Sequence, residues 1–177
     1  MQNKAFAIAT SLLCLVVAAA SQQQDKSKRP SPPAKAEVVL KGKTITIDYS
    51  RPYAKGRKII GGIVPFNQVW RTGANEATTF TTPIDLTVGD AKVPAGTYTL
   101  YSLPSANGWK LIINKQTGQW GTEYDEKQDL ARVDMQTGKT AQPVEQFTIS
   151  FQKKGDDAAT LVMEWENTSA SVAVKAQ

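Results

Sequence analysis

Apolar and polar residues alternate along most of this chain, and this period of two limits the fold more than any other feature. Ile45, Ile47 and Tyr49 fall on one face of such a run, with polar residues between them. The same pattern returns in residues 147–151 and 161–165. A period of two is typical of β-strands that bury one face and expose the other.

Turn-forming residues separate these runs. Clusters of glycine, proline, asparagine and aspartate, often beside lysine or serine, lie at 41–43, 88–90, 94–96, 105–108 and 154–157. This spacing predicts an all-β domain over residues 36–177, a single antiparallel β-sandwich of about eight or nine strands, with a barrel as the alternative. Only residues 122–132 have a pattern that allows a short helix.

The N-terminus has the order of features found in secretory signal peptides. Lys4 precedes an apolar run over residues 5–20, which ends in three alanines. We therefore predict a cleavable signal peptide over residues 1–20 and an exported chain, periplasmic or extracellular, without a transmembrane segment after cleavage. An uncleaved anchor is the alternative, although the run is shorter than the about 20 residues that usually cross a bilayer.

Cysteine and histidine are nearly absent. Cys14 is the only cysteine and lies inside the predicted signal peptide, and there is no histidine. A lipoprotein signal is an alternative, but Leu13 is larger than the residue that such cleavage requires. A chain that loses Cys14 has no disulfide, no thiolate or histidine-based catalytic couple and no ordinary zinc site. We expect no cofactor and no bound metal, and any catalysis would depend on carboxylates, lysine or tyrosine.

The net charge of +5 would by itself suggest a nucleic-acid or membrane partner. Much of it lies in Lys4 and in residues 21–35, which are rich in glutamine and proline. Residues 36–177 keep 16 basic and 15 acidic residues. We therefore expect no nucleic-acid partner, and we predict that residues 21–35 form a solvated, disordered linker.

Residues 50–76 lack the alternation of apolar and polar residues and are too many for an ordinary turn. Long irregular segments are uncommon in compact domains unless they are functional. Five basic residues and no acid lie between Ser50 and Glu76. Arginine side chains suit carboxylate, phosphate or sulfate, and Trp70 offers an aromatic face to a sugar ring or a cation.

A second candidate patch is residues 119–126, where two aromatic residues lie among three acids. Such carboxylates suit Ca²⁺ or acid–base chemistry, and an exposed acidic loop is the alternative. From both segments we predict a ligand site formed by Arg51, Arg57, Trp70, Arg71, Asn75, Glu76, Trp120 and Tyr124.

A structural role is the alternative for the first segment. In that interpretation Arg71 pairs with Glu76 or Asp48, Trp70 belongs to the core, and the glycines serve only tight turns. The glycines do not form a phosphate-binding loop, because that motif needs a strand before it and a helix after it.

Several longer strings carry a resemblance to a known family. RPYAKGR, VPFNQVWRTGANEATTF, VPAGTYTLYSLP, W-x-LIINK and QWG-x-x-Y follow one another between residues 51 and 124. The chain closely resembles, over residues 36–165, a bacterial family of exported proteins known only as a domain of unknown function. The resemblance implies a secreted or periplasmic β-sandwich and implies no activity.

Three classes of function remain at this point. The first is a non-enzymatic binding or envelope-associated module whose basic and aromatic loop contacts an anionic or carbohydrate ligand. The second is a hydrolase or lyase for such a ligand, which acts through Glu76, Tyr124 or Asp125 with Arg71 stabilising negative charge. The third is a purely structural envelope protein.

Overall fold

The computed structural model describes residues 25–177, so the predicted signal peptide lies outside the described part. Nine strands form one antiparallel sheet in the order β1-β2-β3-β6-β7-β8-β9-β4-β5. The strands are β1 Pro33–Leu40, β2 Lys43–Ser50, β3 Thr79–Thr82, β4 Leu86–Val88, β5 Ala91–Val93, β6 Gly96–Ser105, β7 Gly108–Asn114, β8 Asp129–Lys153 and β9 Ala158–Ala176. The predicted all-β fold and its strand number are confirmed.

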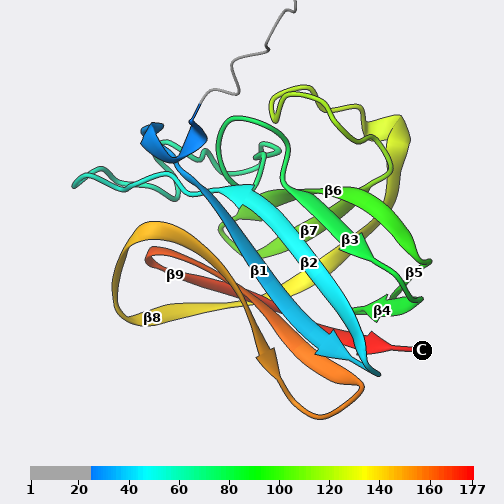
Figure 1. The fold of residues 1–177 in the computed structure, drawn as a ribbon. Coiled ribbons are helices and arrows are strands. Elements are labelled where there is room, and N and C mark those ends of the chain that lie inside the picture. The colour runs from blue at the N-terminus through cyan, green and yellow to red at the C-terminus, as the bar shows by residue number, and fades with distance from the viewer. Residues whose placement is uncertain (1–24) are drawn as a thin grey trace, which may run out of the picture.

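The long strand β8 belongs to both layers of the sandwich. Its first residues, 129–135, pair with β7, and its later residues pair with β9. Figure 1 shows β8 and β9 running across the pair of β1 and β2, and β1 contacts both of them. The sheet is open, because β1 and β5 are its two edges.

The core lies between these layers. The alternating residues Ile45, Ile47 and Tyr49 of β2 are buried, as are Phe147 and Ile149 of β8. The rings of Tyr49 and Phe147 meet edge to face at 5.8 Å between centroids. The Tyr49 hydroxyl accepts a hydrogen bond from the Ile149 amide at 2.9 Å, so a buried polar contact joins the two layers.

Residues 51–78, between β2 and β3, are irregular, as the sequence predicted. The first of them cover the edge of β8 that β7 leaves free. Tyr53 forms an isolated bridge with Gln146, and the amides of Ala54 and Phe147 donate to the carbonyl oxygens of Glu145 and Pro52. Covering an edge in this way satisfies its backbone groups.

The structure differs from the sequence interpretation at the N-terminal side of the domain. Strand β1 begins at Pro33, and a short 3-10 turn, η1 Lys26–Lys28, precedes it. The Arg51 amide donates to the Pro32 carbonyl oxygen at 2.9 Å. The prolines of this segment read as linker in the sequence, but their extended backbone also suits an edge strand.

The helix allowed for residues 122–132 is absent. The structure has only a 3-10 turn, η2 Glu126–Gln128, and β8 begins directly after it at Asp129. Pairing with β7 explains this difference, because it draws residues 129–132 into the sheet. No helix of residues 25–177 is long and apolar enough to span a membrane.

Candidate functional site

Three isolated bridges hold the irregular segment against the sandwich. Tyr53 pairs with β8, as described above, Trp70 pairs with Ser102 of β6, and Glu76 pairs with Trp120. The Trp70 and Ser102 backbones exchange two hydrogen bonds of 2.8 and 2.9 Å. These contacts bring the two candidate segments, residues 50–76 and 119–126, together at one end of the sandwich.

Most residues of the string WRTGAN have a structural contact that explains them. Trp70 stacks on Trp165 with centroids 5.6 Å apart. Thr72 is fully buried and its hydroxyl lies 2.6 Å from that of Ser102. Gly73 has a φ of 150°, and an added Cβ would lie 3.0 Å from the Ser50 carbonyl oxygen. Asn75 donates from its side-chain amide to the Ser31 carbonyl oxygen at 3.0 Å.

Arg71 is the exception in this string. Its Nε donates to the Gly73 carbonyl oxygen at 3.3 Å, which is the only hydrogen bond of this side chain within residues 25–177. Its stem rests on Gly121, where an added Cβ would lie 2.9 Å from Cδ of Arg71. No carboxylate of the described residues forms an ion pair with it. The guanidinium is therefore positioned but not neutralised.

The alternative in which Arg71 pairs with Glu76 or Asp48 is wrong. Glu76 instead binds Arg29, whose Nη1 donates to both carboxylate oxygens at 2.8 and 3.0 Å, and Lys26 at 3.0 Å. Asp48 pairs with Lys35 at 3.4 Å. Both acids are thus engaged by residues of the segment 21–35, for which the sequence predicts a solvated, disordered linker.

Two cavities share Ile63, Trp70 and Arg71 in their walls, and we call them together the Arg71 site. The larger has a volume of about 310 Å³ and the smaller about 270 Å³. The larger is also lined by Tyr53, Lys55, Arg57 and Trp165, and the smaller by Tyr101 and Tyr124. No aspartate or glutamate among the described residues lines either cavity. The Arg71 site is therefore basic and aromatic, with a volume at the low end of small-molecule sites.

The structure brings four of the predicted site residues together at the Arg71 site and places the others elsewhere. Arg57, Trp70, Arg71 and Tyr124 line its cavities. Arg51, Asn75, Glu76 and Trp120 do not line them.

Arg51 has a structural role. Its Nε donates to the Phe147 carbonyl oxygen at 2.9 Å and its Nη2 to the Thr148 hydroxyl at 2.7 Å. These bonds fasten the end of β2 to β8. Arg57 is more exposed, and its guanidinium donates to the carbonyl oxygens of Ala54 and Tyr53 within its own turn.

Glu76 is held as a carboxylate. The hydrogen bond from the Arg29 guanidinium lowers the pKa of Glu76 to about 2. The backbone amide of Glu76 itself and Lys26 act in the same direction, and burial opposes them. Trp120, its bridge partner, is 46% exposed. These two residues lie beside the Arg71 site rather than in it.

Tyr124 belongs to a hydrogen-bonded cluster with Asp129 and Arg132 that the sequence did not predict. Its hydroxyl donates to Asp129 at 2.7 Å and accepts from Arg132 at 2.7 Å. Asn114, fully buried, donates to the other oxygen of Asp129 at 2.8 Å. Burial, followed by the hydrogen bond to Asp129, raises the pKa of Tyr124 to about 12. The phenol therefore stays protonated at neutral pH.

Among the lining residues that the sequence interpretation missed are Tyr53, Lys55, Ile63, Tyr101 and Trp165. Tyr53 and Lys55 lie within RPYAKGR, so the basic run was a signal that could have included them. Tyr101 and Trp165 sit in alternating strands and read as core positions. Their arrival at the site depends on how the whole fold places β6 and β9, which no local pattern encodes.

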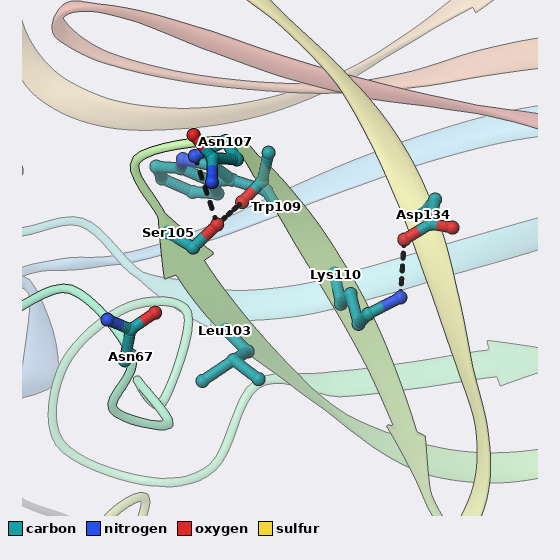
Figure 2. Close-up of a pocket in the computed structure, with 8 residues that line it drawn as sticks. Asn67, Leu103, Ser105, Asn107, Trp109, Lys110 and Asp134 are labelled. Carbon is teal, nitrogen blue, oxygen red and sulfur yellow. Dashed lines mark hydrogen bonds and ion pairs between the residues drawn. The ribbon is translucent and has the colours of Figure 1, made fainter.

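A separate cavity of about 230 Å³ lies at the β6–β7 hairpin (Figure 2). The Ser105 hydroxyl donates to the Gly108 carbonyl oxygen at 2.7 Å, and Lys110 pairs with Asp134 at 2.5 Å. These polar groups are engaged within the protein. Across residues 25–177, no three histidine, cysteine or acidic side chains come together as a metal site.

Comparison with known proteins places this architecture in a family. Residues 31–174 match the family described as protein of unknown function (DUF2911). The chain belongs to DUF2911. The match includes both segments that line the Arg71 site, and it agrees with the resemblance seen in the sequence strings. No curated protein and no solved structure matches the chain.

Proposed function

We propose that this DUF2911 protein is a binding module that takes an anionic ligand carrying a ring, such as an acidic sugar, at the Arg71 site. The observation that carries the proposal is the unneutralised guanidinium of Arg71, which lines both cavities. A half-buried arginine without an acidic partner is costly unless a bound anion completes its hydrogen bonds.

The surroundings of Arg71 support an anion with an apolar or ring-shaped body. Lys55 and Arg57 add positive charge to the larger cavity, and Trp70 with Tyr53 adds aromatic surface. Thr72, the next residue, has a backbone φ of 53°. A β-branched residue rarely adopts this conformation, and such strain clusters where a fold must fix a functional side chain.

The enzymatic alternative has less support. Glu76, Tyr124 and Asp125 were its candidate groups, and each is engaged elsewhere. Glu76 has its pKa lowered to about 2 and Tyr124 has its pKa raised to about 12, so neither exchanges a proton readily near neutral pH. The Asp125 carboxylate accepts a hydrogen bond from the Lys127 amide and caps η2.

We also propose that the protein acts after export, in the periplasm or outside the cell. The support is the order of charge, apolar run and small residues over residues 1–20. An exported location would expose the Arg71 site to envelope glycans.

A thermal-shift screen of the exported, purified chain tests the binding proposal. The panel contains acidic glycans, neutral glycans, polyphosphate and divalent cations. A ligand at about 100 times its Kd stabilises the native state by about 2.7 kcal/mol, which raises the Tm by about 5 °C or more. We expect such a shift with an acidic glycan, and not with its neutral counterpart.

Arg71→Ala should remove this shift and lower the unliganded stability by about 1 kcal/mol or less, because Arg71 makes one long hydrogen bond. Lys92→Ala, which removes an exposed charge on β5, is the matched control and should retain the shift. A shift that survives Arg71→Ala, or no shift across the panel, would reject the proposed site.

A further inference from the structure

The loop formed by residues 55–67 exposes large apolar side chains. Ile63 is 47% and Phe66 41% exposed, and only Val39 and Trp120 are comparable among large apolar residues of the described chain. Figure 1 shows the segment after β2 projecting from the sandwich beside η1. A soluble surface tolerates single apolar residues, but two of them in one projecting loop form a local apolar tip.

The loop holds these two side chains outward by a compact internal structure. Ile59 and Val64 are fully buried and anchor it. The Val64 amide donates to the Ile59 carbonyl oxygen, and the Gly61 amide to that of Val64, both at 2.9 Å. The Phe66 ring lies against Gly61, where an added Cβ would be 2.7 Å from Cε2. The exposure of Ile63 and Phe66 is thus a fixed property of the loop.

Positive charge lies in the same loop as the apolar tip. Lys55, Arg57 and Lys58 lie in the same loop, and none of them forms an ion pair with a described carboxylate. Two nearby acids are turned to the backbone: Glu145 accepts from the Lys55 amide at 2.8 Å and Glu166 from the Ile59 amide at 3.1 Å. The loop therefore combines an apolar tip with three cationic side chains that no described carboxylate pairs.

We propose that residues 55–67 dock on the surface of an anionic lipid bilayer. Ile63 and Phe66 enter the boundary between headgroups and acyl chains, while Lys55, Arg57 and Lys58 remain at the level of the anionic headgroups. The near-neutral charge of the whole domain does not oppose this, because the charge that matters is confined to the loop.

A bilayer fits this tip better than the other partners. A soluble anion would pair with the lysines but leave the apolar side chains in water. A stable protein interface buries about 1,000 Å² or more, which two projecting side chains do not supply. Ile63 also lines both cavities of the Arg71 site, so a docked loop would hold that site close to the membrane surface.

Vesicle co-sedimentation of the exported, purified chain tests this inference. One set of vesicles contains phosphatidylcholine with a minority of phosphatidylglycerol, and the other contains phosphatidylcholine alone. We expect the protein to sediment with the anionic vesicles only. Raising the salt from about 0.1 M to about 1 M, which shortens the screening length from about 10 to 3 Å, should release it.

Two substitutions separate docking from the Arg71 site, because neither residue lines its cavities. Phe66→Ser should lower the bound fraction by about tenfold or more, and Lys58→Glu should lower it by severalfold. Both variants should keep the thermal shift with the acidic glycan if that shift exists. Membrane docking can therefore fail while ligand binding at the Arg71 site holds, and ligand binding can fail while membrane docking holds.

The matched controls lie on other strands. Val39→Ser removes an exposed valine of β1 that is 45% accessible, and Lys92→Glu reverses an exposed charge of β5. Both should bind anionic vesicles like the parent chain. The proposal is overturned if the parent chain does not sediment with anionic vesicles, or if Phe66→Ser sediments as well as Val39→Ser.

Discussion

Glu76 illustrates how single charges organise this protein at the residue scale. Its carboxylate accepts hydrogen bonds from Arg29 and forms an ion pair with Lys26, and so attaches residues 26–29 to the end of the irregular segment that precedes β3. The side chain is still 42% exposed. The attachment therefore depends on a screened surface interaction, strengthened by the geometry of two partners on one acid.

The lowered pKa of Glu76 predicts a pH-dependent stability. The folded-state pKa of about 2 lies below the ordinary value of 4.5, so folding favours the ionised carboxylate. Its contribution is complete above about pH 5 and is lost as the pH falls towards 2. Because the group is exposed, we expect Glu76→Gln to lower the free energy of unfolding by about 1 kcal/mol at pH 7.

Urea unfolding at pH 7 and at about pH 2 measures this effect. The difference between the parent chain and Glu76→Gln should nearly vanish at the lower pH. Glu37→Gln, at an exposed position of β1 without an ion pair in the described residues, should show little difference at either pH. A Glu76→Gln deficit of equal size at both pH values would contradict the assignment.

Arg51 and Arg71 mark the limit of sequence reasoning at this scale. Both lie in a basic, irregular segment, and the segment was correctly predicted to be irregular. The two arginines differ in their hydrogen-bond partners, and the partners of Arg51 are distant in sequence. Arg51 binds Phe147 and Thr148 of β8. Residue type and local charge could suggest both arginines but could not tell which one is structurally engaged.

At the scale of elements, the loop of residues 55–67 depends on close backbone approach. A Cβ at Gly62 would lie 2.3 Å from the Lys58 carbonyl oxygen, a distance that the loop cannot accept without moving. We predict that Gly62→Ala lowers the free energy of unfolding by about 1–3 kcal/mol, the usual cost of forcing an extra carbon into a packed site.

Gly138→Ala is the matched control for this substitution. Gly138 lies in β8, and nothing approaches within 4 Å of its added Cβ. Alanine there should change stability by less than about 0.5 kcal/mol, because it mainly restricts the unfolded chain. Chemical denaturation of both variants measures the difference. Equal stability of the two variants would show that the loop relaxes freely around Gly62.

At the scale of the whole molecule, the alternation of apolar and polar residues predicted the strands. It did not predict that β8 pairs with β7 in one layer and with β9 in the other. Its pairing with β9 shifts register between Lys139 and Val144 and again between Val144 and Thr148. This stretch is mostly polar and carries no period that would fix its face. The docking of residues 25–35 was missed for a related reason, since its partners Asn75 and Glu76 lie more than forty residues away.

The continuous sheet and shared core predict that both layers unfold together. Tyr49 is the test, because its buried hydroxyl joins β2 to the Ile149 amide one hundred residues later. Tyr49→Phe leaves that amide without this partner, so we expect the free energy of unfolding to fall by about 1–3 kcal/mol. In urea, circular dichroism and tryptophan fluorescence should still give one coincident transition with an unchanged m-value. Tyr98→Phe removes a hydroxyl whose only hydrogen bond among residues 25–177 goes to the Pro94 carbonyl oxygen, four residues away, and should cost less. If the two probes gave separate transitions in Tyr49→Phe, the layers would unfold independently once this hydrogen bond is lost. The contact of Tyr49, and not the common core, would then couple the two layers in the parent chain.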